Sequence, residues 1–235
     1  MQVSANLNLV RQRISAACAR SGRRAEAVTL ITVSKGQPAE VVCAAAELGL
    51  SIFGESRVQE AKSKIGLCPG RLRWHLIGHL QSNKCRDAVQ FFAMIQSVDS
   101  LALAQEINRW AEKSAKTMPV LIEVNVAGES SKFGYAPEKV LAELKEINAL
   151  PRIELHGLMT VAPFAQDVEK VRPVFARLRE LKGQCEDVLG APLTDLSMGM
   201  SGDFEVAVEE GATIIRLGSA VLGPRAALRP AAGDP

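Results

Sequence analysis

Short apolar runs alternate with longer amphipathic segments along the whole chain. The runs are rich in β-branched residues, which favour strands, and the longer segments repeat apolar residues at helical spacing. The pattern predicts eight strands, at Val28–Ser34, Ile52–Gly54, Leu72–Gly78, Met94–Val98, Val120–Val126, Leu155–Thr160, Asp195–Met198 and Thr213–Leu217. It predicts helices between them over 38–48, 57–65, 82–91, 100–115, 137–148, 167–186 and 203–210.

Proline and glycine support several of these boundaries. Pro38 and Pro137 stand where two of the helices begin, and proline is favoured at a first helical position. Gly49 and Gly211 follow the last residues of two helices, where glycine accepts the left-handed conformation that often ends a helix.

The N-terminal segment predicts one additional helix. Val3, Leu7, Val10 and Ile14 recur at helical spacing, and no continuous apolar core of a targeting peptide is present. We therefore expect a surface helix of the folded protein, followed by a solvated turn at the basic run Arg20–Arg24.

Eight strands separated by helices are typical of a single (β/α)₈ TIM barrel of the α/β class. An open doubly wound sheet shows the same alternation, but no G-x-G-x-x-G follows the first strand. No linker rich in Pro, Gly or Ser interrupts the pattern, so residues 1–235 are predicted to form one barrel domain. The Ala- and Pro-rich segment 224–235 is expected to be a loosely ordered tail.

Composition narrows the function classes. The 235 residues are 47% hydrophobic and 23% charged, with a mean hydropathy of +0.07, as in a folded globular protein. A net charge of +2 and an aromatic content of 4% argue against nucleic-acid binding. No apolar run reaches the ~20 residues of a membrane span.

The cysteines and histidines show no metal-site spacing. The five cysteines are scattered and form no C-x-x-C pair, and none of the three histidines lies at ligand spacing from a cysteine. We expect reduced thiols, buried as small apolar side chains, in a cytoplasmic protein without a bound metal.

The first predicted strand ends in V-S-K, at Lys35. Reactive side chains of a barrel lie at the carboxyl ends of its strands, and a period of two directs Lys35 to the same side as Ile31 and Val33. A lysine whose pKa is lowered by desolvation or by a neighbouring cation forms Schiff bases with aldehydes. The alternative is a lysine whose stem packs while its ammonium group reaches water.

The last two strands each end in small residues. After the seventh strand, Ser201 and Gly202 are predicted to stand at a helix N-terminus, with Asp203 in its first turn, and the eighth strand ends in R-L-G-S. Backbone N–H groups at such positions bind anions, and barrels often hold phosphate in these two loops. An ordinary serine cap followed by a turn glycine is the alternative.

Two further polar segments follow other strands. W-H-L-I-G-H-L-Q-S-N-K contains His79, a candidate ligand contact, whereas Trp74 and His75 also suit the core or a loop. The segment V-N-V-A-G-E-S-S-K-F-G after the fifth strand is either a lid or a solvated loop.

These motifs together resemble the pyridoxal phosphate homeostasis proteins. The resemblance spans about residues 28–223 and rests on V-S-K, F-G-E-S-R-V-Q-E, W-H-L-I-G-H-L-Q-S-N-K, S-K-F-G, H-G-L-M-T and L-S-M-G-M-S-G-D-F-E…R-L-G-S-A-V-L-G. It implies a single barrel similar to the N-terminal domain of alanine racemase that holds pyridoxal 5′-phosphate as a Schiff base.

The resemblance also implies roles for individual residues. Lys35 matches the Schiff-base lysine, and Arg216 matches the residue that faces the pyridine nitrogen. The residues matching phosphate contacts are Ser201, Gly218 and Ser219. His79 and Asn83 match motif positions with less defined contacts. The F-G-E motif usually continues with Asn, and Ser56 at this place puts an amide contact in doubt.

An arginine at the ring nitrogen limits the chemistry. Arginine stays protonated and disfavours a proton on the ring, and an unprotonated ring is a poor electron sink. Tyr135, the chain's only tyrosine, lies in the loop after the fifth strand, so the second-domain tyrosine base of alanine racemase has no counterpart. We therefore expect a protein that stores the cofactor and supplies it to apo-enzymes, without strong catalytic activity of its own. The resemblance implies that it is a monomer.

Two alternatives belong to other function classes. One is a pyridoxal-phosphate-dependent amino-acid racemase whose second base comes from Lys132, His79 or a partner chain. The other is a Schiff-base aldolase that acts on a sugar phosphate, which would bind no chromophore.

Overall fold

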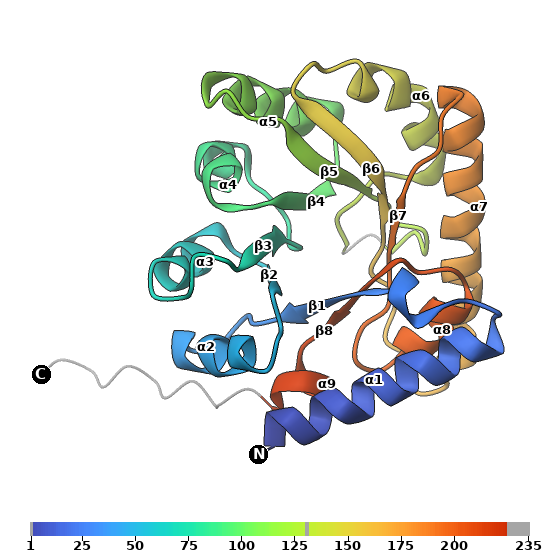
Figure 1. The fold of residues 1–235 in the computed structure, drawn as a ribbon. Coiled ribbons are helices and arrows are strands. Elements are labelled where there is room, and N and C mark those ends of the chain that lie inside the picture. The colour runs from blue at the N-terminus through green and yellow to red at the C-terminus, as the bar shows by residue number, and fades with distance from the viewer. Residues whose placement is uncertain (1, 130–131, 225–235) are drawn as a thin grey trace, which may run out of the picture.

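Eight parallel strands form a closed barrel in chain order (Figure 1). The structure is a computed structural model that describes residues 2–129 and 132–224. The strands are β1 (Thr29–Val33), β2 (Ile52–Glu55), β3 (Arg73–Leu76), β4 (Met94–Val98), β5 (Met118–Glu123), β6 (Ile153–Met159), β7 (Asp195–Ser197) and β8 (Ile214–Leu217). The pairing of β1 with β8 closes the barrel, so the predicted barrel is confirmed and the open sheet is wrong.

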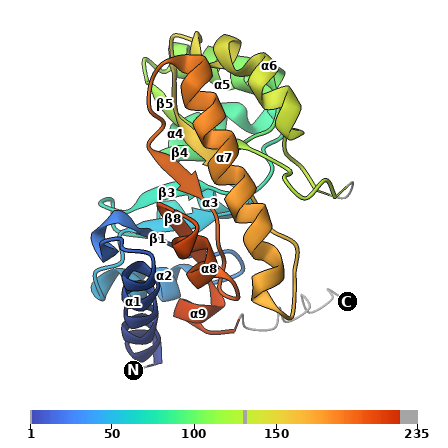
Figure 2. The same ribbon diagram turned by 90° about the vertical axis from the view of Figure 1, so that its right-hand side faces the viewer.

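Helices surround the strands (Figures 1 and 2). They are α1 (Gln2–Arg20), α2 (Ala39–Glu47), α3 (Val58–Ile65), α4 (Cys85–Phe91), α5 (Leu101–Lys113), α6 (Pro137–Asn148), α7 (Arg172–Leu189), α8 (Phe204–Glu209) and α9 (Ser219–Leu222), with 3₁₀ turns η1 (Ala25–Ala27), η2 (Ser82–Lys84) and η3 (Val168–Val171). The predicted helices 82–91 and 167–186 therefore both begin as a 3₁₀ turn.

The boundary residues follow the sequence prediction with one shift. Pro38 is the residue before α2, in extended conformation, so this helix begins one residue later than predicted. Pro137 lies in the first turn of α6 as expected. Gly49 and Gly211 have φ values of +86° and +102°, which confirms their role after a helix end.

The predicted N-terminal helix is α1, which packs against α8 and α9. Its apolar stripe, with Leu7, Val10 and Ile14, is buried. The basic run at its end contains the expected turn, at Ser21 and Gly22, and Gly22 and Arg24 are exposed. Two of its arginines also contact α8, because Arg20 Nε lies 2.7 Å from Glu209 Oε1 and Arg23 donates to the Val208 carbonyl at 2.7 Å. The contacts of Arg20 and Arg23 thus fix the basic run against α8.

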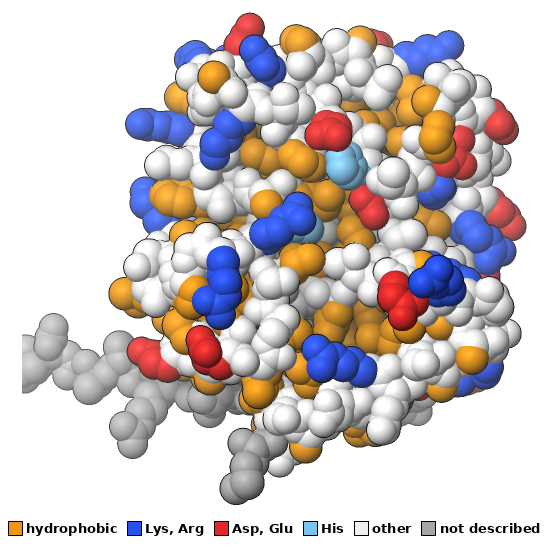
Figure 3. All heavy atoms as spheres, in the orientation of Figure 1, with side chains coloured by type: hydrophobic (Ala, Val, Ile, Leu, Met, Phe, Trp, Pro, Cys, Tyr) orange, Lys and Arg blue, Asp and Glu red, His pale blue; other side chains and the backbone are white. Residues whose placement is uncertain are grey.

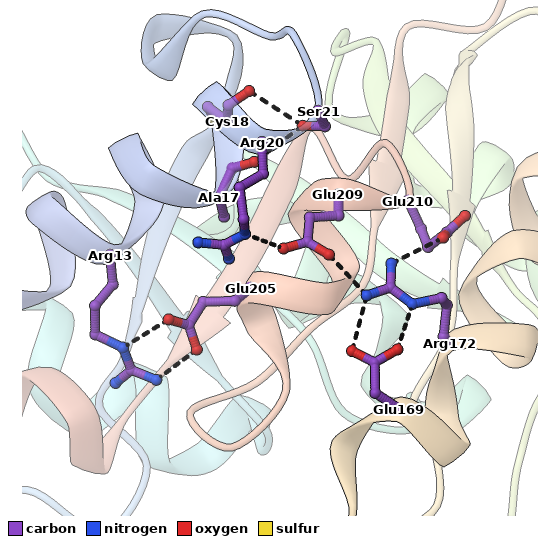
Figure 4. Close-up of polar contacts among 10 residues, drawn as sticks. All are labelled: Arg13, Ala17, Cys18, Arg20, Ser21, Glu169, Arg172, Glu205, Glu209 and Glu210. Atoms are coloured by element: carbon purple, nitrogen blue, oxygen red, sulfur yellow. Dashed lines mark hydrogen bonds and ion pairs between the residues drawn. The ribbon is translucent and has the colours of Figure 1, made fainter.

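A second arginine joins α7 to the same helix. Arg172 donates to Glu169 at 2.6 Å, to Glu209 at 2.7 Å and to Glu210 at 3.1 Å (Figure 4). Hydrogen bonds to these carboxylates, above all Glu169, raise the pKa of Arg172 above its usual value. We call these four residues the Arg172 cluster. It links η3, α7 and α8 on the outside of the barrel.

Apolar side chains fill the barrel interior as well as the layer between sheet and helices. The interior group is Ile31, Met94, Leu121, Met159 and Ile214. Gly54 faces it, because a Cβ there would come within 2.9 Å of Ile31 Cγ2. In the view of Figure 3, apolar side chains lie in a hollow at the centre of the ring of helices, with basic and acidic side chains spread around it.

The remaining sequence expectations concern membrane-spanning helices, cysteines, metal ligands and the C-terminal tail. No helix within the described ranges is long and apolar enough to cross a membrane. All five cysteines carry free thiols, and the Sγ atoms of Cys43 and Cys68 are 3.8 Å apart. Within the same ranges no group of three or more metal-ligating side chains suits a metal ion. The expected tail lies, from residue 225 onward, outside the described residues.

Candidate functional site

Lys35 lies two residues beyond β1, at the carboxyl end of the barrel. Its side chain lines a cavity of about 270 Å³ together with Ser56, His79, Glu123 and Lys132. The backbone alternation explains this position, because Ile31 occupies the barrel interior and Lys35 continues the same row. Two of the other predicted site residues, Ser56 and His79, thus share one cavity with the lysine.

A buried lysine fixes the backbone beside Lys35. Lys64 on α3 is 6% exposed, and its Nζ donates to the Ser34 carbonyl at 2.7 Å, to Glu55 Oε1 at 2.8 Å and to Glu60 Oε1 at 2.7 Å. Glu60 Oε1 also accepts the Gly36 N–H at 2.6 Å. The peptide groups on both sides of Lys35 are therefore held by one ion-pair group, which we call the Lys64 cluster.

Glu55 completes the Lys64 cluster from the end of β2. Its carboxylate is fully buried and accepts the Ser34 hydroxyl at 2.7 Å. Burial raises the pKa of Glu55, and the hydrogen bonds from Lys64 and Ser34 oppose that shift. Sequence reasoning missed this cluster, although the i, i+4 spacing of Glu60 and Lys64 was a signal for an ion pair.

A line of hydrogen bonds crosses the barrel interior. Arg216 on β8 donates to Ser197 Oγ at 2.7 Å, and Ser197 donates to Gln96 Oε1 at 2.6 Å. Gln96 Nε2 lies 3.1 Å from His75 Nδ1 on β3. Because the amide donates, the histidine proton belongs on Nε2, which has no partner within the described part of the chain. We call these four residues the interior polar chain.

Burial keeps His75 neutral, at the end of the interior polar chain that lies opposite Arg216. Burial lowers the pKa of His75 to about 4, with a smaller contribution from Arg73. The sequence left His75 open as a core or loop residue, and the structure shows it 4% exposed and inside the barrel. Gln96 and Ser197 were not recognised as site residues, because a polar residue in a short strand gives no indication of its partner.

Arg216 carries a positive charge that the barrel interior does not neutralise. It is 4% exposed, and its second hydrogen bond goes to the Thr160 carbonyl at 2.8 Å. It forms no ion pair with any described residue, and burial lowers its pKa to about 10 despite the more distant Glu123 and Asp203. A buried cation with neutral partners is suited to an electron-rich ligand.

The loops after β7 and β8, whose small residues predicted phosphate-binding turns, are in contact with each other. The Ala220 N–H donates to Ser201 Oγ at 3.3 Å, and Ser219 is the first residue of α9. Gly218 is in close contact with β1, since a Cβ there would lie 3.3 Å from the Val33 carbonyl oxygen. Because β8 pairs with β1, these two loops adjoin the Lys35 segment.

The helix after Ser201 begins later than expected. α8 begins at Phe204 with Asp203 as the residue before it, so Ser201 does not stand at its N-terminus and Asp203 is not in its first turn. Asp203 Oδ1 instead accepts the Met200 N–H at 2.6 Å and closes the turn. The start of this helix is therefore shifted by one residue from the predicted range 203–210, and the two loops adjoin each other.

The segment W-H-L-I-G-H-L-Q-S-N-K places only some of its predicted site residues at the Lys35 cavity. His79 Nδ1 lies 3.0 Å from Asp99 Oδ2, and its ring stacks on Phe133 with 3.8 Å between centroids. Gly78 packs tightly on the loop after β2, because a Cβ there would meet the Ser56 carbonyl oxygen at 2.5 Å. Asn83 is exposed on η2 and does not line the cavity of Lys35.

The loop after β5 lies against the barrel mouth. It projects from one end of the barrel in Figure 2. Lys132 Nζ donates to the Ala162 carbonyl at 3.2 Å, and Phe133 stacks on His79, so the described part of this loop is not simply solvated. Phe133 was not recognised from the sequence as a site residue, although S-K-F-G was among the motifs.

Tyr135, at the end of that loop, is not among the residues that line the Lys35 cavity. It is 2% exposed, and its hydroxyl donates to Glu143 on α6 at 2.7 Å. Burial, together with Glu143, raises the pKa of Tyr135 above its usual value. It is thus held as a neutral structural hydroxyl.

The residues present fit a phosphorylated aldehyde. A lysine lines the cavity, a buried arginine on the adjacent strand has no ion-pair partner within residues 2–129 and 132–224, and two serine-bearing loops follow β7 and β8. The fold and site together define a class of protein, the (β/α)₈ barrels with a lysine-lined cavity at the carboxyl end of the first strand.

Comparison with known proteins identifies the family within this class. The family described as "Alanine racemase, N-terminal domain" matches residues 5–226. A pyridoxal phosphate homeostasis protein of Aquifex aeolicus is 42% identical over 226 residues, covering 96% of this chain and 99% of that protein. The human protein of the same name is 38% identical over 239 residues, covering 95% of this chain and 86% of that protein. The chain belongs to the pyridoxal phosphate homeostasis protein family.

Solved structures agree with this placement. PipY of Synechococcus elongatus PCC7942, solved with pyridoxal phosphate bound, has a TM-score of 0.80 and 37% identity, and covers 91% of this chain and all of that one. The same protein without the cofactor has a TM-score of 0.86 and 36% identity, covering 94% and 100%. An alanine racemase of Clostridium difficile 630, at 18% identity and a TM-score of 0.71, covers 94% of this chain and 56% of its own, and shows the shared fold alone.

Proposed function

We propose that this chain binds pyridoxal 5′-phosphate as a Schiff base on Lys35 and takes part in storing and supplying the cofactor. The observation that carries the proposal is the cavity lined by Lys35, together with a buried arginine on the neighbouring strand β8 that forms no ion pair with any described residue. The family supports it, because relatives are named for pyridoxal phosphate homeostasis and PipY binds this cofactor.

Each part of the ligand has a candidate partner. Pyridoxal phosphate supplies an aldehyde that condenses reversibly with amines. We assign its attachment to Lys35, its phosphate to Ser201, Gly218 and Ser219, and its ring nitrogen to Arg216. His79, Asn83 and Ser56 are proposed as lesser contacts. Of these, Asn83 has the weakest structural support because it is exposed and outside the cavity.

The same residues favour a carrier without strong catalytic activity. A protonated Arg216 leaves the ring nitrogen without a proton, which weakens electron withdrawal. Tyr135 is committed to Glu143 and offers no second base. The racemase alternative retains one supporting observation, namely that Lys132 lines the same cavity as Lys35. The aldolase alternative has no support among the named relatives.

We further propose that residues 1–235 act as one monomeric barrel domain in the cytoplasm and that apo-enzymes dependent on pyridoxal phosphate receive the cofactor. Gel filtration coupled to light scattering tests the monomer. Activation of an apo-enzyme by loaded protein, compared with the same amount of free cofactor, tests the supply.

The first test is an absorption spectrum of the loaded protein, followed by borohydride reduction and peptide mass mapping. We expect a visible Schiff-base band and a label on the Lys35 peptide. Lys35→Ala should abolish the label in a folded barrel, whereas Lys132→Ala, at the other lysine of the cavity, should retain it. A label on Lys132, or no loading at all, would contradict the assignment. Saturable turnover of one amino acid that disappears in Lys35→Ala would favour the racemase.

A further inference from the structure

Glu123 is a carboxylic acid in the Lys35 cavity to which the proposed function gives no role. It is the last residue of β5, two positions beyond the interior residue Leu121, so it follows the inward row of that strand. Its side chain lines the cavity together with Lys35. Its Oε2 atom is buried and has no hydrogen-bond partner within residues 2–129 and 132–224.

The neighbouring charged groups are already engaged. Asp99, after β4, is paired with His79, which follows β3. Lys132, in the loop after β5, donates to the carbonyls of Val161 and Ala162 and lies 2.9 Å from Glu129. Arg216 on β8 is bonded to Ser197 and Thr160. Glu123 forms no ion pair in the described part of the chain. Lys35, two residues beyond β1, also lines this cavity.

The environment of Glu123 favours its protonated form. Burial raises the pKa of Glu123 to about 7, and the negative charge of Asp99 adds to the shift while Arg216 opposes it. A carboxyl group with a pKa near the working pH both accepts and releases protons readily.

Such a group assists exchange of the bound cofactor with an amine that enters as an ammonium ion. An aliphatic amine has a pKa of ~10.4 and is therefore an ammonium ion near neutral pH, without the lone pair it needs as a nucleophile. The carboxylate that shares the cavity with Lys35 is suited both to bind this cation and to take its proton.

We propose that Glu123 binds the ammonium group of a small primary amine in the Lys35 cavity and removes its proton, which makes the site an entry point for amines. The step is R–NH₃⁺ + Glu–COO⁻ → R–NH₂ + Glu–COOH, and it needs no oxidant or further reactant. The inference rests on the proposed function, because the free amine is useful only where Lys35 holds an exchangeable aldehyde.

The test compares two amines on the loaded full-length protein. Ethylamine is an ammonium ion at neutral pH and needs a proton acceptor, whereas methoxyamine is already neutral there. We expect Glu123→Gln to slow the release of the cofactor by ethylamine at least ~10-fold at pH 7 and to leave release by methoxyamine within about twofold. Glu123→Asp, which keeps the acid, should restore part of the ethylamine rate.

A measurement on the unloaded protein separates this inference from the proposed function. In ¹³C NMR of the glutamate side-chain carboxyls, one signal should titrate near pH 7 in the wild type and be missing in Glu123→Gln. Equal slowing of both amines, no slowing of either, or titration of this carboxyl in its usual range would overturn the role of Glu123. If the wild type, Glu123→Gln and Glu123→Asp all failed to form a Lys35 adduct, that result would instead overturn the proposed function, and the amine site with it.

Discussion

Arg172 and Arg216 place the same guanidinium group in two contrasting regions of the molecule. On the outside of the barrel, Arg172 bonds three glutamates, and its pKa lies above the usual value. Inside the barrel, Arg216 bonds a serine hydroxyl and a backbone carbonyl, and burial lowers its pKa to about 10.

The difference separates ion pairs that are complete within the fold from buried ionisable groups that lack an ion-pair partner among the described residues. The Arg172 cluster and the Lys64 cluster lie on the helix side of the sheet, and each contains its own counter-charges. At the barrel mouth, Arg216 and Glu123 lack ion-pair partners among the described residues. An unpaired buried charge costs stability, so its retention is expected where a ligand supplies the missing partner.

The largest expected effect is at the Lys64 cluster. Lys64→Met leaves Glu55 buried without its cation, so we expect the free energy of unfolding to fall by about 3–5 kcal/mol. Urea titration measures it. Lys62→Met on the same helix is the matched control, because Lys62 is 55% exposed and forms a single surface ion pair with Asp87. An equal effect of the two substitutions would show that the buried cluster does not stabilise the fold.

An intermediate effect is expected at the Arg172 cluster. Arg172→Met should lower the free energy of unfolding by about 1–2 kcal/mol, since an ion-pair network at partly exposed positions is weakened by solvent. The loss should shrink when the titration is repeated in about 1 M salt, which screens the wild-type network. Arg177→Met, on the same helix with a 61% exposed side chain, is expected to change little. A loss independent of salt would contradict an electrostatic origin.

The smallest effect on stability is expected at Arg216. Arg216→Met removes a buried charge but leaves the Thr160 carbonyl without its donor, so the free energy of unfolding of the unloaded protein should change by less than about 1 kcal/mol. Affinity for pyridoxal phosphate, measured by absorbance titration, should fall about 10- to 100-fold. A large loss of stability with unchanged affinity would place Arg216 with the structural clusters instead.

The sequence was sufficient for the architecture, because alternating apolar runs and helical spacing report burial directly. All eight strands and α1 were predicted, and the period of two placed Lys35 at the cavity. Packing between distant segments could not be predicted from apolar runs or helical spacing. Lys62 and Lys64 look alike in the sequence, and only the docking of α3 on β2 decides that Lys64 is the buried one.

Loop composition indicated where candidate site residues lie. Contacts between side chains that are distant in the sequence were not predicted. The small residues after β7 and β8 indicated phosphate-binding turns on adjacent strands, and the structure brings these two loops into contact. The start of α8 was misplaced, because Asp203 closes a turn with Met200 rather than entering the helix. Gln96 and Ser197 lie 101 residues apart in the chain, so their contact has no local signature.

The contact between α1 and α8 has a consequence for the order in which the protein is assembled. Arg13 and its partner Glu205 are 192 residues apart, and β1 must pair with β8 before the barrel is closed. Domains dominated by such distant contacts fold slowly, and apolar surfaces that wait for their partners are prone to aggregate. On the ribosome, the apolar stripe of α1, which is synthesised before the eight strands, therefore remains without α8 and α9 until almost the whole barrel has been synthesised.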